Sequence, residues 1–350
     1  MSELQKIVVG IRSSNLSKSQ TNLLIQELLK QDPNLNKDIF NIKTIKTTGD
    51  VHNTHRLDQI GGKGLFIKEI EEQIISGKID IGVHSMKDVP AQDVYPDLDI
   101  ICWMQRHKTN DALISNSGKS FMDLPAGSVI GTSSIRRRSQ VLSLRKDLSI
   151  KLLRGNVDTR IQKLKNHEYD AIILSLAGLA RLNLDHLVTE VLEHNLFLPA
   201  ACQGAVGVQA LKSSEVKKIL APINDLKTQT ECMAERRVLK NINANCNSPV
   251  SIYANINENN PIHKIKVSSE SANDKILELR NHKIPDVDLV NIVQKISSLI
   301  PGSHQHITAC IDEWIKCYEK INISPADVKN LHYFKNWFGR ELLYMSFTKK

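Results

Sequence analysis

The sequence lacks any long hydrophobic run. Its most apolar stretch, residues 171–180, is far short of the roughly 20 residues that cross a bilayer, and the apolar run of residues 7–11 ends at Arg12 with no basic leader before it. These absences argue against a transmembrane segment and an ordinary signal peptide. We therefore expect a cytoplasmic protein that does not use a membrane as a partner.

Cysteines are few, and no two of them lie close together in the sequence. The 350 residues hold six cysteines and no CxxC pair, a pattern typical of reduced thiols rather than of a disulfide framework or zinc site, and no metal is expected. Apolar or helical patterns around four of them predict core positions: Cys102, Cys232, Cys310 and Cys317. Cys246 lies instead in a polar, Asn-rich turn, where a reactive or covalently modified thiol competes with a plain surface cysteine.

Positive charge is concentrated in one segment. Lys and Arg number 46 against 38 Asp and Glu, a net charge of +8, and residues 131–165 alone hold ten basic and two acidic residues, which also gives +8. A local excess of this kind favours a site for an anion over a broad nucleic-acid surface. Only Tyr169 provides an aromatic ring nearby, whereas binders of nucleic acid place aromatics beside their basic groups. No nucleic-acid partner is expected.

Alternating strand-like and helical patterns divide the chain. Two successive strand–helix–strand modules predict two doubly wound α/β domains, and a strand-like run at residues 205–209 could return to the first sheet. A helix and three alternating runs then predict a smaller α+β domain, followed by a helical tail that holds eight of the sixteen aromatics. The expected boundaries are 1–104 with 204–224, then 105–203, 225–305 and 306–350.

Two helix starts carry hydroxyls and arginines. Residues 132–137, Thr-Ser-Ser-Ile-Arg-Arg, follow a buried strand, and residues 153–160 repeat the arrangement with Arg154 and Arg160. The free N–H groups of a helix N-terminus at a strand end bind anions in open α/β sheets. A carboxylate or phosphate site is the functional interpretation, and a solvated helix start is the alternative.

Lys87 and Asp88 also follow a buried run, in the segment His-Ser-Met-Lys-Asp-Val-Pro at residues 84–90. A surface ion pair is the common outcome for such neighbours, but a carboxylate at a strand end can also stabilise a developing positive charge. The glycine-rich residues 61–64 lack the spacing of a phosphate-binding P-loop and predict only a loop that carries Lys63.

Taken in order, these segments resemble the porphobilinogen deaminase family over residues 6–256. The resemblance rests on Gly-Gly-Lys-Gly-Leu-Phe (61–66), Val-His-Ser-Met-Lys-Asp-Val-Pro (83–90), Gly-Thr-Ser-Ser-Ile-Arg-Arg (131–137), Leu-Arg-Gly-Asn-Val (153–157) and Gln-Gly-Ala-Val-Gly (203–207). It implies two domains of periplasmic-binding-protein type and a third that carries a dipyrromethane cofactor through a thioether, by position on Cys246.

The family's activity joins four porphobilinogen molecules, with loss of ammonia, into hydroxymethylbilane for tetrapyrrole and haem biosynthesis. The resemblance implies a monomeric transferase with this small-molecule substrate and makes Asp88 its catalytic carboxylate. The implied cofactor- and substrate-binding residues are Arg12, Ser14, Lys63, Ser85, Lys87, Thr132, Ser133, Ser134, Arg136, Arg137, Arg154, Arg160, Arg181 and Gln203.

The chain departs from the family pattern at four positions. Asn245 and Cys202 replace glycines, Gln59 replaces a lysine, and Asn110 stands where an arginine is common, with Arg106 or Lys108 as possible substitutes. The rival interpretation is a non-catalytic, two-lobed receptor for a carboxylate, which would share the fold. The third domain with its polar-turn cysteine speaks against that rival.

Overall fold

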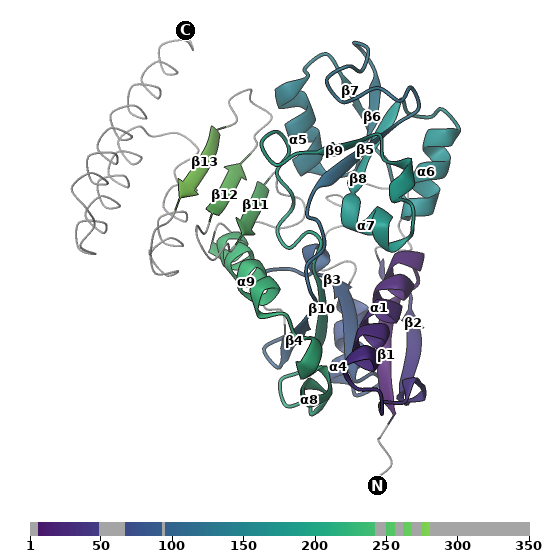
Figure 1. Ribbon diagram of the computed structural model, residues 1–350, viewed down its shortest axis with the longest axis vertical. Helices are drawn as coiled ribbons and strands as arrows, with labels where there is room; N and C mark the ends of the chain where they lie inside the picture. Colours follow the sequence, from purple (N-terminus) through teal and green to yellow (C-terminus); the bar gives the residue numbers. More distant parts are fainter. Residues whose placement is uncertain are drawn as a thin grey trace, which may run out of the picture. The chain divides into compact units, whose positions relative to one another are not determined.

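The computed structural model describes residues 6–48, 67–92, 95–241 and 250–255, and the backbone of 262–267 and 275–280 (Figure 1). Residues 1–236 and 244–281 group into one compact unit, which is the part described below. Within the described residues, no helix is both long and apolar enough to span a bilayer. The expected helix from residue 287 and the expected tail 306–350 lie outside the described residues.

The first lobe is built on a five-stranded sheet of order β2-β1-β3-β10-β4. β1 pairs in parallel with β2 and β3, whereas β10 runs antiparallel to both β3 and β4. The prediction that residues 205–209 return to this sheet is confirmed by β10. The elements are β1 (Ile7–Arg12), α1 (Asn15–Gln31), β2 (Phe40–Ile45), α4 (Lys68–Ile75), β3 (Ile81–Ser85), β4 (Leu98–Trp103), β10 (Val206–Leu211) and α8 (Val216–Leu220).

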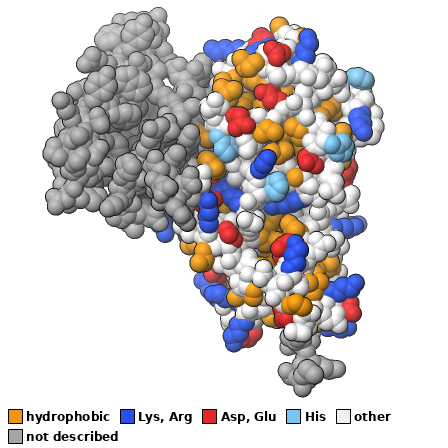
Figure 2. Space-filling model, viewed as in Figure 1, with side chains coloured by type: hydrophobic (Ala, Val, Ile, Leu, Met, Phe, Trp, Pro, Cys, Tyr) orange, Lys and Arg blue, Asp and Glu red, His pale blue; other side chains and the backbone are white. Residues whose placement is uncertain are grey.

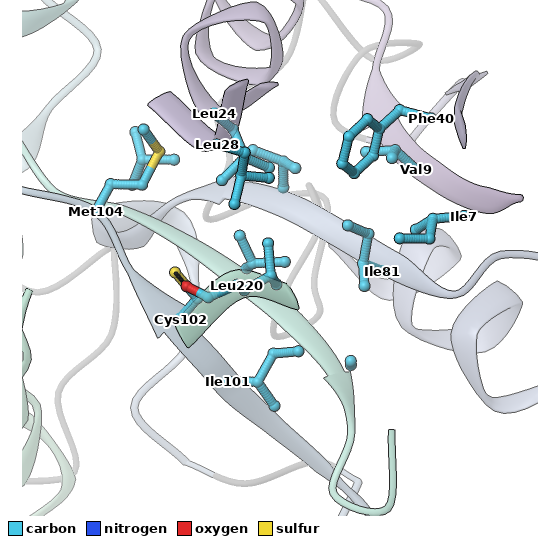
Figure 3. Packing of buried hydrophobic residues seen from close by; sticks show 14 of the residues in the cluster. Ile7, Val9, Leu24, Leu28, Phe40, Ile81, Ile101, Cys102, Met104 and Leu220 are labelled. Atoms are coloured by element: carbon cyan, nitrogen blue, oxygen red, sulfur yellow. Dashed lines mark hydrogen bonds between the residues drawn. The ribbon is translucent and has the colours of Figure 1, made fainter. Parts of the chain in front are cut away.

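The core of this lobe explains its local structure. β1 lies between β2 and β3 in the sheet, Val9 and Ile11 are fully buried, and Leu24 and Leu28 of α1 pack in the same core. Figure 3 shows these leucines with side chains from the neighbouring strands and Leu220 of α8. α1 begins where Ser14 accepts a hydrogen bond from the Ser17 amide at 3.1 Å, as expected of a serine N-cap.

The second lobe repeats this topology. Its sheet has the order β7-β6-β8-β5-β9, with β6, β7 and β8 parallel and β5 antiparallel to both neighbours. Apolar clusters, one around Leu153 and Ile172 and one around Phe121 and Ile173, form its core. The predicted pair of α/β domains is therefore confirmed at the level of the fold. The elements are β5 (Asp111–Ser115), β6 (Val129–Gly131), α5 (Ile135–Leu144), β7 (Ser149–Lys151), α6 (Val157–Lys165), β8 (Ala171–Ser175), α7 (Leu176–Arg181) and β9 (Glu190–Leu192).

A long helix and a small antiparallel sheet follow. α9 (Leu226–Asn241) precedes β11 (Val250–Asn255), β12 (Ile262–Val267) and β13 (Lys275–Arg280), which pair in that order. The three alternating runs of the sequence correspond to these three strands. Short 3₁₀ helices complete the elements of the described residues, at Lys37–Ile39, Met86–Asp88, Asp185–Leu187 and Ala221–Ile223.

Candidate active site

Asp88 lies at the carboxyl end of β3, on the single 3₁₀ turn Met86–Asp88. Its Oδ2 is 3.9 Å from Nη1 of Arg12, the last residue of β1, and about a third of the Asp88 side chain is exposed. Ser85 is held by Gln20 of α1, whose Nε2 donates to the Ser85 hydroxyl at 2.7 Å. The parallel order of β1 and β3 thus brings Arg12, Ser85 and Asp88 to one edge of the sheet.

Lys87 is not an ordinary surface lysine. Burial lowers the pKa of its ammonium group to about 8, with Asp88 and Asp111 opposing this shift and Arg136 and Arg137 adding to it. Because those arginines belong to α5 of the second lobe, charges from both lobes act on Lys87. This environment favours the site interpretation of the Lys87-Asp88 pair over the surface pair.

Asp111 holds the two arginines at the start of α5. The carboxylate is fully buried, with Oδ2 at 2.8 Å from Arg136 Nη1 and Oδ1 at 2.8 Å from Arg137 Nη2. Although burial raises the pKa of Asp111, the two guanidinium groups outweigh burial and hold that pKa well below its usual range. Gln203 also donates to Asp111 Oδ1, at 2.9 Å. Three expected ligand-binding residues therefore share a partner inside the chain.

Asp111 is a site residue that the sequence patterns do not single out, although a signal is present. It opens the otherwise apolar run Asp-Ala-Leu-Ile, where a carboxylate needs a buried partner. Sequence alone does not reveal that the partner is the Arg136-Arg137 pair. Arg137 keeps one buried donor, Nε, without a hydrogen-bond partner among the described residues.

The hydroxyls of the 132–134 motif cap the helix that they precede. Ser134 is the N-cap of α5 and accepts from the Arg137 amide at 3.4 Å, and Thr132 accepts from the Ser134 amide at 3.1 Å. Both bonds agree with the helix-start alternative. Ser133 is partly exposed, and its expected role in binding stays a prediction.

Burial lowers the pKa of three further arginines, and for Arg160 neighbouring cations add to this effect. Burial, together with the charges of Arg137, Arg154 and Arg12, lowers the pKa of Arg160 to about 10. Burial lowers the pKa of Arg181 to about 10 and also lowers that of Arg154. Desolvated cations that repel one another are stabilised by a bound anion.

Backbone carbonyls orient two of these arginines. Arg160 Nε donates to the Gly155 carbonyl at 2.7 Å, and Arg181 Nη2 donates to the Gly204 carbonyl at 2.6 Å. Arg181 Nε is buried without a hydrogen-bond partner among the described residues. This donor set fits a ligand with several carboxylates, such as a dipyrromethane, because guanidinium groups pair with carboxylates in two-pronged fashion. By contrast, Figure 2 shows basic and acidic side chains interspersed on the face drawn, without a continuous basic surface.

The segments that connect the lobes are tied to α9 by Arg106. Its guanidinium donates to Glu235 at 2.9 and 3.0 Å and to the Gln203 carbonyl at 3.0 Å. Arg106 is therefore engaged with α9 and the Gln203 carbonyl, and the expectation that Arg106 or Lys108 substitutes for an arginine at position 110 stays a prediction. Asn110 itself donates to the Leu192 carbonyl at 3.1 Å.

Cys202 occupies a backbone conformation that favours glycine, with φ at +58°. Its thiol is buried and lies 3.5 Å from the Cys232 carbonyl, and its amide donates to Glu235. Cys102 and Cys232 are buried as predicted. Cys202, Cys232 and Glu235 lie close enough to suggest a metal site, but Glu235 already accepts from Arg106, Cys202 and the Ala254 amide. We therefore interpret the cluster as a structural contact, in which Glu235 of α9 binds Arg106 and the Cys202 amide.

Lys63 and Cys246 lie outside the described residues, as do Gln59 and Asn245. Their expected roles stay predictions from the sequence.

Comparison with known proteins gives the chain its family. The family model described as porphobilinogen deaminase, dipyromethane cofactor binding domain, matches residues 7–218. Proteins named porphobilinogen deaminase from Bacillus mycoides (strain KBAB4) and Bacillus cereus (strain AH820) are each 44% identical over 262 residues, which cover 74% of this chain and 83% of theirs.

Solved structures similar to this chain include the ligand-binding component of an ABC-type import system from Staphylococcus aureus and an alkanesulfonate-binding protein from Xanthomonas axonopodis pv. citri. The first has a TM-score of 0.36 and 12% identity, covering 67% of this chain and 73% of that one. The second has a TM-score of 0.34 and 16% identity, covering 68% and 75%. These likenesses are too distant to carry an argument about function. On its sequence relatives and its family match, the chain belongs to the porphobilinogen deaminase family.

Proposed function

We propose that this chain is a transferase that joins four porphobilinogen molecules, with release of ammonia, into hydroxymethylbilane. The observation that carries the proposal is the placing of Asp88 among cations of both lobes: Arg12 lies 3.9 Å away, and the charge of Asp88 acts on Lys87 and on Arg160 of α6. An anionic substrate that becomes cationic where it reacts needs both kinds of charge in one site.

The cations would bind the carboxylates of the substrate and of the growing chain. Each porphobilinogen has an acetate and a propionate side chain, so every added unit brings two more carboxylates. The candidates are Arg12, Lys87, Arg154, Arg160 and Arg181. Burial of the last four, and for Lys87 and Arg160 also the charge of neighbouring arginines, favours occupation by an anion. Arg136 and Arg137 are anchored on Asp111 and would contribute only the donors that this pairing leaves over.

Asp88 would act on the charge that develops in the substrate. When the aminomethyl C–N bond of porphobilinogen breaks, ammonia leaves with the bonding electron pair and the pyrrole ring becomes a cationic azafulvene. A carboxylate fixed beside that ring stabilises the cation by Coulomb attraction, which is strong in a site of low dielectric. Arg12 would orient this carboxylate rather than contact the reacting atoms.

The dipyrromethane cofactor would be attached to Cys246 through a thioether and held by the same arginines. When bound, it supplies the terminal pyrrole to which the first substrate unit is added. The expected division into 1–104 with 204–224, 105–203, 225–305 and a tail 306–350 belongs to this proposal, as do the cytoplasmic location and the monomeric state.

The test combines ammonia release with intact mass. Asp88→Asn should fold and keep the added mass of the cofactor, yet lose turnover by several orders of magnitude, while the exposed control Asp97→Asn should match wild type. Cys246→Ala should show unmodified mass and no turnover. A wild-type chain that binds porphobilinogen but releases no ammonia would be a receptor instead of an enzyme.

A further inference from the structure

Arg236 of α9 contacts the backbone directly after Asp88. Its Nη1 donates to the Val89 carbonyl at 3.0 Å and its Nη2 donates to the Pro90 carbonyl at 2.8 Å. One planar guanidinium thus holds two successive carbonyls, a fork geometry that a lysine cannot reproduce. The two held residues are the first and second after the proposed catalytic carboxylate.

The segment has further contacts on both sides of Asp88, where the side chains of Met86 and Val89 belong to one buried apolar cluster. Before Asp88, the Met86 amide donates to the Ala205 carbonyl at 3.1 Å, and the Met86 side chain is buried. After Asp88, the Val89 amide closes the turn onto the Met86 carbonyl at 3.3 Å, and Pro90 has no N–H to donate. The fork of Arg236 adds two hydrogen bonds between α9 and the backbone that follows Asp88.

A small hollow borders the segment. A hollow of about 50 Å³ is lined by Val89, Pro90 and Arg236 together with Glu71 and Gln209. The two hydrogen bonds of Arg236 at the border of this hollow therefore add to the packing of the buried Val89 side chain in holding the segment.

Glu71 also lines the hollow, and its carboxylate interacts with the charge of Arg236. Gln209 Nε2 donates to Glu71 Oε1 at 2.9 Å. Burial raises the pKa of Glu71, and the hydrogen bond from Gln209 and the charge of Arg236 oppose this rise only in part. The Glu71 carboxylate in its ionised form attracts the Arg236 guanidinium.

We propose that Arg236 is a positioning residue that fixes the backbone after Asp88 and so places the Asp88 carboxylate against the reacting substrate. The inference rests on the proposed function of Asp88. Misplacing a catalytic group by about 1 Å can cost on the order of 100-fold in rate, so the effect belongs in kcat. KM should change little, because other cations bind the carboxylates of the substrate.

The experiment compares Arg236→Met and Arg236→Lys with Arg237→Met in the full, cofactor-loaded chain. Arg237 is the next residue of α9 and is exposed, which makes it a matched control. We expect kcat to fall about 10- to 100-fold in Arg236→Met and less in Arg236→Lys, with KM within about threefold of wild type. Hydrogen exchange of the amides in residues 85–92 should rise in both variants, whereas Arg237→Met should change none of these quantities.

Three results would overturn the proposal. They are unchanged exchange in residues 85–92, a rise of KM at constant kcat, and an equal loss of kcat in Arg237→Met. If Arg236→Met does not fold, Arg236→Lys decides by the same readouts. If Asp88→Asn retains turnover, the proposed function fails, and the exchange data still decide whether Arg236 holds the segment.

Discussion

Asp111 shows how much one buried carboxylate can determine. As the first residue of β5, it forms ion pairs with Arg136 and Arg137 of α5. The start of the helix is thereby joined to the sheet. Buried pairs of this kind add little to stability by their presence, but removing one partner leaves uncompensated charge.

Asp111→Asn should therefore destabilise the fold by about 3–5 kcal/mol, because two buried guanidinium groups lose their counter-charge. Urea unfolding of the full chain measures this. Glu27→Gln, which breaks the exposed pair with Lys30 at 2.7 Å, is the control and should leave the midpoint unchanged. A small effect of Asp111→Asn would mean that the arginines find other partners, and that a bound anion is not needed to hold them.

Deprotonation of Lys87 should weaken the binding of porphobilinogen at alkaline pH. Its pKa of about 8, against an ordinary 10.5, means that the ammonium is lost as pH rises through 8. KM for porphobilinogen should then increase above about pH 8, and this rise should vanish in Lys87→Met but persist in the exposed control Lys78→Met. A rise of equal size in Lys87→Met would remove Lys87 from substrate binding.

The same shift has a consequence for stability. The unfolded chain binds more protons than the folded chain between pH 8 and 10.5, so the free energy of unfolding should rise with pH in that window. The rise should be absent in Lys87→Met. Below pH 8 the charged Lys87 thus lowers the free energy of unfolding. This agrees with a role in binding rather than in stability.

The sequence predicts the residues that point into this site better than their partners. Asp88 follows a strand and Arg160 lies in the first turns of a helix, so local patterns predict both, whereas Arg181, the last residue of α7, is implied only by the family resemblance. The Arg136–Asp111 and Arg236–Val89 contacts join positions far apart in sequence, and only the tertiary structure chooses such pairs. Lys63 and Cys246, though prominent in the sequence, are not among the described residues.

The sequence predicts strands and helices correctly where polar residues separate one element from the next. The patterns do not predict β4 and β9: β4 is nearly uniform in apolar character, and β9 is a three-residue strand, Glu-Val-Leu, that begins with a charged residue. α7 follows β8 directly, with Ser175 as its N-cap, so residues 171–180 form one apolar run without a turn signal. Loops shorter than the pattern window conceal such boundaries.

The crossing between lobes depends on a glycine. Gly204 has φ at +88°, and a Cβ there would lie 2.6 Å from the His107 carbonyl oxygen on the other connecting segment. The two segments are thus in backbone contact at this point.

Gly204→Ala should destabilise the chain by about 1–3 kcal/mol more than Gly127→Ala. Gly127 has a similar φ of +81°, and a Cβ added there would meet no atom within 4 Å, so its change measures backbone strain alone, about 1–2 kcal/mol. Thermal and urea unfolding of both variants give the difference. Equal destabilisation of the two variants would show that the connecting segments can move apart at Gly204 without a loss of stability.

The chain without cofactor should be an electrostatically strained form of the same protein. Arg160 and Arg181, with pKa values lowered to about 10, have no anion to pair with in that form. We expect Cys246→Ala to melt below the loaded chain, since a ligand held only by the folded state stabilises it.

Sulfate provides the discriminating measurement. It should raise the melting temperature of Cys246→Ala more than that of the loaded chain, because it can occupy the cationic site only where that site is empty. Sodium chloride at matched ionic strength controls for screening. Equal increments in both forms would reflect general exclusion of sulfate from protein surfaces and would count against an anion-requiring cluster.

The place of β10 between β3 and β4 imposes an order on folding during synthesis. All strands of the second sheet lie between Asp111 and Leu192, whereas the first sheet needs Leu211, which is made about 100 residues after β4 ends at Trp103. At about 5–20 residues per second, β3 and β4 wait on the order of 5–20 s for the strand that joins them. The later lobe is thus complete first, and the unfinished first sheet exposes open edges on which chaperones or aggregation can act.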